Sequence, residues 1–101
     1  MKKVTRKKLE GSELNQAVDG LSNWSVEDGK LHKQFKFKGF MQAIGWMVSV
    51  SIAAEKLDHH PEWANVYNRV DVTLTTHDMG NQISTWDIEL AKTMDNLFNG
   101  Q

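Results

Sequence analysis

The chain has 101 residues, 40% of them apolar and 25% charged, with a net charge of −1 and no cysteine. This length and composition fit one soluble globular domain. The lack of cysteine excludes disulfides, thiolate nucleophiles and cysteine-based zinc sites, and the near-neutral charge argues against overall attraction to nucleic acid or to an anionic membrane.

The N-terminal segment is the most basic part of the chain. Five of the twelve basic residues, and no acidic residue, lie within residues 1–8. We expect this segment to be flexible and solvated, rather than an arm that binds RNA or an acidic partner, and residues 9–101 to form a single domain. No apolar stretch typical of a signal peptide follows it, and the apolar-rich residues 40–54 are too few to span a bilayer. Because small secreted domains often contain disulfides, we expect a cytoplasmic protein.

The next part of the chain predicts a helix followed by a hairpin. Ser12 is a suitable N-cap for a helix over residues 13–21, whose apolar side chains share one face. A short strand over residues 24–26 leads to Asp28-Gly29, a pair typical of a type I′ turn. Residues 30–38 alternate between apolar and polar side chains, as expected for a strand with one buried face.

A long helix is predicted over residues 40–57, and Pro61 prevents its continuation. Its apolar stripe is broad, with Trp46 and Val50 expected to lie off the centre. The expected stripe consists of Phe40, Ala43, Ile44, Met47, Val48, Ile52 and Ala54. A helix that is apolar over more than one face must bury a second surface, which in so small a domain can be a subunit interface.

The remaining segment predicts strands and a final helix. Residues 65–75 are strand-like, and they form either a hairpin with its turn at Asn68-Arg69 or one long strand, because periodicity does not decide between them. A loop over residues 78–81 precedes a helix that Ser84 or Thr85 caps and that runs to about Phe98. The order α-β-β-α-β-β-α, with adjacent hairpins, predicts an α+β fold in which an antiparallel sheet carries the helices on one face.

Three of the four histidines, His59, His60 and His77, lie within a span of 19 residues. Imidazole exchanges protons near neutral pH, so three converging histidines would form a general acid–base site. Spacing alone leaves open that all three are ordinary surface residues at a helix end and in a loop. His32 lies on the polar side of its predicted strand, and we interpret it as a surface residue.

Carboxylates accompany these histidines. Glu55 precedes His59 by four residues, within reach on a helix, and Asp58 and Glu62 flank the histidine pair. Asp87 lies in the first turn of the last helix, where a carboxylate also complements the helix dipole without any further function.

The main alternative to an acid–base site is a metal site, since histidine and aspartate both bind zinc and iron. However, adjacent histidines lack the i, i+4 spacing that places two imidazoles on one helical face, so we expect no metal. The chain also lacks a glycine-rich loop before a helix, which argues against phosphate chemistry, and it lacks a Gly-x-Ser-x-Gly elbow.

The sequence resembles the pterin-4a-carbinolamine dehydratase family. The resemblance is strongest in the segment from Glu55 to Trp63, which reads Glu-Lys-Leu-Asp-His-His-Pro-Glu-Trp, and in Thr76-His77. It extends over nearly the whole chain after about residue 9. The further matching positions are Trp24, Gly29-Lys30-Leu31, Lys33, Phe35-Lys36-Phe37-Lys38, Phe40, Ala43, Asn65-Val66-Tyr67-Asn68, Val70, Thr73-Leu74, Asp87-Ile88 and Leu90-Ala91.

The resemblance implies a four-stranded antiparallel sheet with three helices packed on one face, and it favours the hairpin at Asn68-Arg69. It implies dehydration of 4a-hydroxytetrahydropterin to quinonoid dihydropterin, which recycles the cofactor of aromatic amino acid hydroxylases. Acid–base chemistry suffices for this reaction, so no metal or other cofactor is expected. Members of the family are commonly dimers or tetramers, and we expect a homodimer or homotetramer that associates through the helix over residues 40–57.

By matching positions, the resemblance makes His59, His60 and His77 the catalytic or substrate-binding histidines. We expect His59 and His77 to exchange protons with the substrate and His60 to pack on the pterin or bond to it. Asp87 is expected to orient a histidine. The spacing from His77 to Asp87 is ten residues, one more than the resemblance implies, and residues 78–83 lack the usual Gly-Leu-Thr/Ser lead into the helix.

Four further residues are expected to contribute to the site on the same resemblance. Glu55 would support it, and Thr75 and Thr76 would offer backbone groups to the flat, amide-like edge of the pterin. Trp63 would form a wall of the pocket.

Other functions remain open at this stage. Some family members also stabilise the dimer of a transcription factor through the same long helix, so the alternative is a non-catalytic pterin-binding or dimerisation and coactivator module. A further alternative is a divergent relative in another pathway, such as molybdopterin-related metabolism. The complete set of three histidines favours the enzyme.

Overall fold

The computed structural model describes residues 5–101, and within them the helices and strands follow the predicted order. The elements are α1 (Gly11–Asp19), β1 (Ser25–Glu27), β2 (Lys30–Lys36), α2 (Phe40–Leu57), β3 (Glu62–Val66), β4 (Arg69–Leu74), the short 3₁₀-helix η1 (His77–Met79) and α3 (Thr85–Asn99). Of the basic segment predicted to be flexible, residues 1–4 lie outside the described residues.

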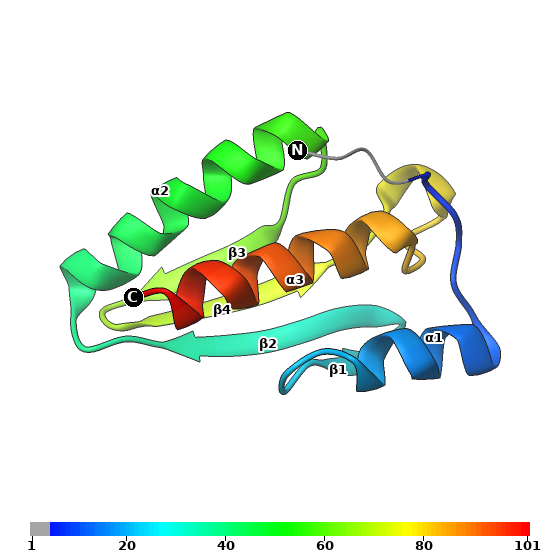
Figure 1. Ribbon diagram of the computed structural model, residues 1–101, viewed down its shortest axis with the longest axis horizontal. Helices are drawn as coiled ribbons and strands as arrows, with labels where there is room; N and C mark the ends of the chain where they lie inside the picture. The colour runs from blue at the N-terminus through cyan, green and yellow to red at the C-terminus, as the bar shows by residue number, and fades with distance from the viewer. Residues whose placement is uncertain (1–4) are drawn as a thin grey trace.

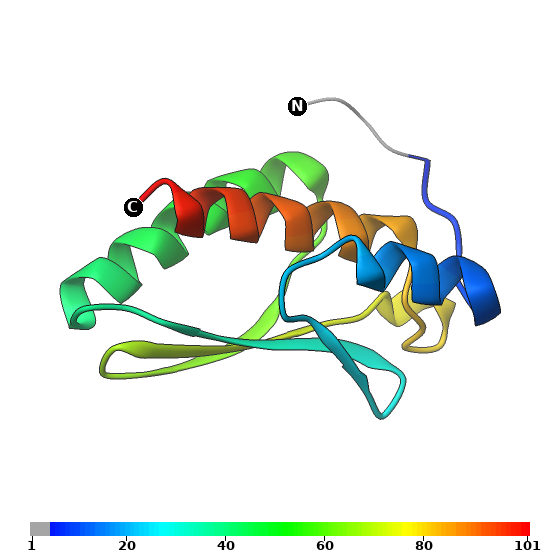
Figure 2. The same ribbon diagram turned by 60° about the horizontal axis from the view of Figure 1, so that its bottom comes forward.

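The four strands form one antiparallel sheet in the order β1-β2-β4-β3. The helices α1, α2 and α3 all lie over the same face of this sheet, as the two views in Figures 1 and 2 show. The predicted α+β architecture is therefore confirmed. None of the helices within residues 5–101 is both long enough and apolar enough to cross a membrane.

The alternative that periodicity left open for residues 65–75 is resolved as a hairpin. The strands β3 and β4 pair along their length, with Glu62 opposite Thr73 at one end and Val66 opposite Arg69 at the other. The turn residues are Tyr67 and Asn68, one position before the predicted pair, and Tyr67 has a φ of 51°. The side chain of Asn65 explains the shift, because it donates to the carbonyls of Tyr67 and Arg69 at 3.2 and 2.9 Å and so closes the turn.

Three predicted boundaries were also wrong by one or two residues. The first helix starts at Gly11, with Glu10 rather than Ser12 at its N-cap and without a side-chain cap. The first strand starts at Ser25, because Trp24 turns inward and its indole donates to Asp95 on α3 at 3.0 and 3.1 Å. The second strand ends at Lys36 rather than Lys38.

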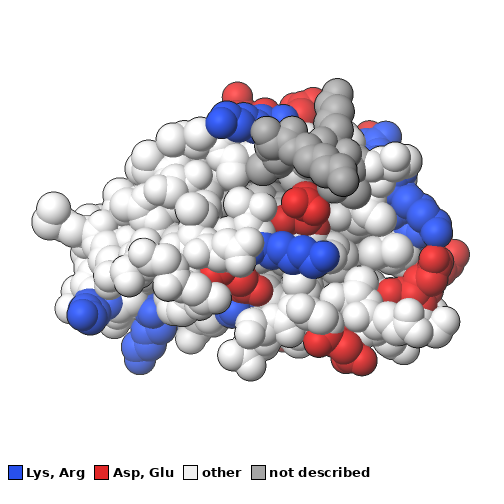
Figure 3. Space-filling model, in the orientation of Figure 1, with Lys and Arg blue, Asp and Glu red and all other residues white. Residues whose placement is uncertain are grey.

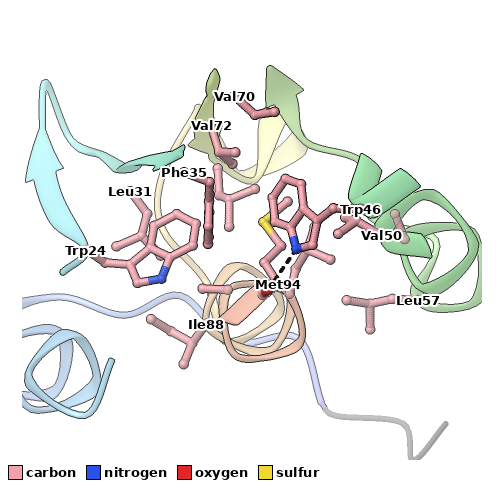
Figure 4. Packing of buried hydrophobic residues seen from close by; sticks show 14 of the residues in the cluster. Trp24, Leu31, Phe35, Trp46, Val50, Leu57, Val70, Val72, Ile88 and Met94 are labelled. Atoms are coloured by element: carbon pink, nitrogen blue, oxygen red, sulfur yellow. Dashed lines mark hydrogen bonds between the residues drawn. The ribbon is translucent and has the colours of Figure 1, made fainter. Parts of the chain in front are cut away.

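The core lies between the sheet and helices α2 and α3. Trp46 is fully buried in it, and its indole nitrogen donates to the carbonyl of Met94 at 3.2 Å (Figure 4). The ring of Phe35, from β2, lies 4.4 Å from that of Trp46. These contacts join β2, α2 and α3, and they hold the first half of α2 against the second half of α3.

The predicted core face of α2 was only partly correct, because Ala43 and Ala54 are buried as expected but Trp46 and Val50, expected off the centre, are fully buried as well. The buried residues are Ala43, Trp46, Val50, Ala54 and Leu57, which follow one another at intervals of three or four positions. The physical reason is that Trp46, the largest apolar side chain of the helix, packs onto the sheet and sets the helix rotation.

An apolar side of α2 therefore remains uncovered. Figure 3 looks onto the helical layer and shows a broad area without charged residues over much of α2. The large exposed side chains on this helix are Phe40, Met41, Val48 and Ile52.

Candidate active site

His59, His60 and His77 line one cavity of about 260 Å³, which is close to the smaller end of ligand pockets. They come from two segments far apart in the chain, the connection from α2 to β3 and the start of η1 after β4. The other lining residues are Asp58, Pro61, Glu62, Thr75 and Asp78. The fold thus brings together the three histidines that the sequence singled out.

The end of α2 sets the direction of His59 and His60. Asp58 adopts a left-handed conformation with a φ of 56°. The amides of Asp58 and His59 donate to the carbonyls of Glu55 and Ala54 at 3.2 and 3.1 Å, which is the Schellman arrangement that ends a helix. His60 then precedes Pro61, which disfavours a helical conformation there. The two adjacent imidazoles therefore leave the backbone where its direction changes.

His59 pairs with Asp87 inside the protein. Its Nε2 atom lies 2.5 Å from Oδ1 of Asp87, and the aspartate is fully buried whereas the histidine is 8% exposed. The ring of Trp86 packs edge-to-face against the imidazole, with 5.8 Å between the ring centroids. Hydrogen bonding to a carboxylate fixes the orientation of an imidazole and stabilises its protonated form.

The other oxygen of Asp87 is held by the start of α3. Oδ2 accepts hydrogen bonds from the amide of Ser84 at 2.9 Å and from Oγ1 of Thr76 at 2.8 Å. The side chain of Ser84 accepts in turn from the backbone amides of Trp86 and Asp87, so that Ser84 and Asp87 form a reciprocal capping box. Asp87 therefore caps its helix and orients His59 at the same time.

The longer loop before α3 does not displace Asp87. The loop contains η1 followed by Gly80 and Asn81, whose φ angles are 71° and 60°. The amide of Thr76 bonds to the carbonyl of Gln82 at 2.8 Å and closes the loop. Asp87 thus reaches His59 despite the ten-residue spacing from His77.

The other two histidines also have carboxylate partners, but at the surface. His60 Nε2 lies 2.6 Å from Glu55, and His77 Nε2 lies 2.7 Å from Glu62. The hydrogen bond from His77, assisted by the nearby Lys30, holds the pKa of Glu62 below its usual value. Each imidazole of the cavity thus has a carboxylate at Nε2, and only the pair of His59 and Asp87 is buried.

The remaining predicted site residues occupy different places. Thr75 lines the cavity, and its buried hydroxyl has no hydrogen-bond partner within residues 5–101. Thr76 is buried behind the cavity, where it bonds to Asp87 and to Ser84. Trp63 lies on β3 with its ring 6.2 Å from that of Trp46, and it is not among the residues that line the cavity.

Sequence reasoning missed two contributors. Asp78 lines the cavity, whereas the sequence pattern predicts no more than a loop at this position. Ser84 was considered as a cap without its bond to Asp87, although Ser-x-x-Asp at positions 84–87 is a capping-box pattern.

The arrangement is suited to proton transfer. Three imidazoles can accept or donate protons near neutral pH, and the buried carboxylate stabilises one of them when it is charged. The unpartnered hydroxyl of Thr75 offers a hydrogen bond to a ligand.

Comparisons with known proteins point to a single family. Residues 7–97 match the family described as Pterin 4 alpha carbinolamine dehydratase. A protein of Jannaschia sp. (strain CCS1), provisionally named a pterin-4-alpha-carbinolamine dehydratase, is 50% identical over 94 residues, which cover 89% of this chain and 95% of that protein. A protein of Prochlorococcus marinus (strain NATL2A) with the same provisional name is 42% identical over 91 residues, or 90% and 95% of the two chains.

A solved structure agrees as well. The crystal structure of a transcriptional coactivator/pterin dehydratase from Brucella melitensis superposes with a TM-score of 0.86 at 45% identity, covering 90% of this chain and 98% of that one.

Proposed function

The chain belongs to the pterin 4 alpha carbinolamine dehydratase family, and on that premise we propose that it converts 4a-hydroxytetrahydropterin to quinonoid dihydropterin and water. The observation that carries the proposal is the cavity with three histidines and a buried carboxylate behind one of them. By the same family relationship, the reaction would serve tetrahydropterin recycling. The absence of cysteine favours the cytoplasm as its location.

The reaction needs one proton acceptor and one proton donor. The substrate carries an amine nitrogen and a hydroxyl group on one carbon. A base removes the proton from nitrogen, whose electron pair forms the carbon–nitrogen double bond as the carbon–oxygen bond breaks. An acid delivers a proton to the departing hydroxyl, which leaves as water. Two imidazoles can perform both transfers without a metal or another cofactor.

His59 is suited to take up the proton. Its Nε2 faces Asp87, so this nitrogen carries the hydrogen of the neutral ring and Nδ1 is left as the acceptor. The negative charge of Asp87 then stabilises the imidazolium that forms. Thr76 and Ser84 support this role indirectly, because they hold the carboxylate in place.

His77 is suited to deliver the second proton. It lines the same cavity as His59 from the chain's other lining segment, and its exposed side chain can recover a proton from water. Glu62 holds its ring through Nε2. His60, which Glu55 supports, would contact the pterin ring without exchanging protons.

Thr75 is the residue proposed to bind the substrate through its side chain. Its hydroxyl is buried at the cavity without a partner in residues 5–101, and a hydrogen bond from the polar edge of a pterin would satisfy it. Backbone groups of Thr75 and Thr76 remain candidates for contacts to the same edge. Trp63 would act through the packing of β3 against α2 rather than as a wall of the cavity.

We propose that a second copy of the chain covers the apolar side of α2. Met41, Val48 and Ile52 are 86%, 56% and 57% exposed, which is unusual for such side chains on one helix. Self-association would remove them from water and would give a homodimer or homotetramer.

One observation favours a second candidate function, a non-catalytic pterin-binding or coactivator module. The Brucella melitensis protein is called a transcriptional coactivator as well as a dehydratase. The test is the rate at which the purified protein dehydrates freshly generated 4a-hydroxytetrahydropterin. Acceleration over the spontaneous rate supports the enzyme, whereas pterin binding without acceleration supports the module.

A further inference from the structure

Arg6 contacts two residues that support different histidines of the cavity. Its Nη1 atom lies 2.6 Å from Oδ2 of Asp78, which follows His77 directly and lines the cavity. Its guanidinium group also lies over the ring of Trp86, 5.2 Å from the centroid, within the range of a cation–π contact. Trp86 in turn packs against His59.

The backbone around Arg6 is anchored to the loop that leads into α3. The amide of Leu9 donates to the carbonyl of Ile83 at 2.9 Å, and the amide of Thr85 donates to the carbonyl of Lys7 at 2.9 Å. The hydroxyl of Thr85 donates to the carbonyl of Thr5 at 2.5 Å. Residues 5–9 therefore lie beside the loop that carries the cap of α3, on the same side of the molecule as η1 (Figure 1).

We propose that Arg6 is a positioning residue of the active site, which holds η1 and His77 through Asp78 and holds His59 through Trp86. Arg6 lies directly before the part of the chain that matches the family, residues 7–97. The proposal deepens the proposed function and rests on it where turnover is concerned.

The ion pair of Arg6 and Asp78 also changes the electrostatics of the cavity. Asp78 is a carboxylate at the edge of a site whose imidazoles already have carboxylate partners. The hydrogen bond from Arg6 holds the pKa of Asp78 below its usual value, so the group stays charged and paired. The carboxylate of Asp78 also interacts electrostatically with His59. Arg6 therefore offsets a negative charge near His59 as well as holding the loop.

The expected size of the effect of removing Arg6 follows from the solvent exposure of its ion pair with Asp78. The side chains of Arg6 and Asp78 are 36% and 65% exposed, and exposed ion pairs change equilibria by about two- to fivefold. We expect Arg6→Gln to lower kcat by about that factor with little change in KM, because a misplaced proton donor affects the transition state more than substrate binding.

The test uses three variants, Arg6→Gln, Asp78→Asn and the double variant that carries both changes. Lys8→Gln is the control. The control removes a cation from the same segment, but its side chain pairs with the exposed Glu10, at 3.7 Å, and Lys8 is not among the residues that line the cavity. Two measurements are made on each protein, kcat and KM for dehydration, and the NMR signals of the His59 and His77 rings. The NMR spectra need no substrate, so they test the positioning even if the wild type proves inactive.

We expect Arg6→Gln to shift both ring signals and to lower kcat, whereas Lys8→Gln changes neither. In the Asp78→Asn background the further effect of Arg6→Gln on kcat should fall below about twofold, because the partner is already lost. Ring signals that move no more in Arg6→Gln than in Lys8→Gln would overturn the proposal, whatever the activity of the wild type.

Discussion

The Nε2 atom of His59 lies 2.5 Å from Oδ1 of Asp87, a carboxylate that is fully buried at the start of α3. The other oxygen of this carboxylate is occupied by Ser84 and Thr76. The helix that stabilises the fold therefore also sets the orientation and tautomer of the proposed base.

The first prediction concerns this pair. In Asp87→Asn the amide oxygen should keep the bonds to Ser84 and Thr76, so that the amide nitrogen faces His59. Because this nitrogen donates, Nε2 of His59 must accept and the hydrogen of the neutral ring moves to Nδ1. We expect kcat to fall by roughly 10²- to 10³-fold, since proton transfer by a positioned side chain contributes that much. Stopped-flow absorbance on freshly generated substrate measures it.

Asp95→Asn is the matched control for that change. Asp95 is also buried on α3, but it bonds to Trp24 and Lys33 at the other end of the helix, away from the cavity. This variant should lose stability and keep its kcat. Wild-type turnover in Asp87→Asn would contradict the assigned role of Asp87.

The second prediction concerns Thr75, whose buried hydroxyl has no partner within the described residues. Thr75→Val removes an unsatisfied polar group, so we expect the melting temperature to stay the same or rise. The lost bond to the substrate should raise KM by about five- to tenfold, which corresponds to a typical net hydrogen bond. Thr75→Ser should restore KM. A lower melting temperature with an unchanged KM would show that the hydroxyl serves the fold instead.

The third prediction concerns the uncovered side of α2. Ile52→Glu places a charge among the exposed Met41, Val48 and Phe40, so self-association through this helix should weaken. Light scattering should give a smaller mass for this variant than for the wild type. Gln16→Glu, an exposed change on α1, should leave the mass unchanged. Equal masses for wild type and Ile52→Glu would argue against α2 as the interface.

The fourth prediction concerns the pH dependence of stability. The hydrogen bond from His77 lowers the pKa of Glu62 in the folded state below its usual value. The contribution of Glu62 is therefore complete above that value and is lost as the pH falls through the folded-state pKa. The pair is exposed, so the contribution should not exceed about 1 kcal/mol.

Chemical denaturation between pH 3 and pH 6 measures this contribution. The difference in unfolding free energy between wild type and Glu62→Gln should shrink as the pH is lowered. A difference that grows toward acid pH would mean that Glu62 is not stabilised by its charge.

Much of the fold follows from sequence patterns, and the exceptions have identifiable causes. The alternation over residues 30–36 and the limits of α2 were predicted because they depend on local periodicity. The rotation of α2 was not, since two apolar faces compete and only packing on the sheet decides in favour of Trp46.

The site was predictable to a smaller extent. Histidine spacing suggested an acid–base site, but the family resemblance was needed to bring His77 to His59 and His60. The buried bonds of Asp87 to His59 and Thr76 join residues 28 and 11 positions apart, which no local pattern reveals. The contact of Arg6 with Asp78, 72 positions away, was equally hidden, because a basic N-terminal segment is typical of solvated chain ends.

The most direct test of the central claim is the rate of dehydration of freshly generated 4a-hydroxytetrahydropterin by the wild type, by His59→Ala and by His77→Ala. Both variants should remain folded, and circular dichroism would confirm it. We predict that the wild type accelerates the reaction and that each variant loses at least about 10²-fold of the acceleration. A folded wild type without acceleration, or variants that keep it, would contradict histidine acid–base catalysis in this cavity.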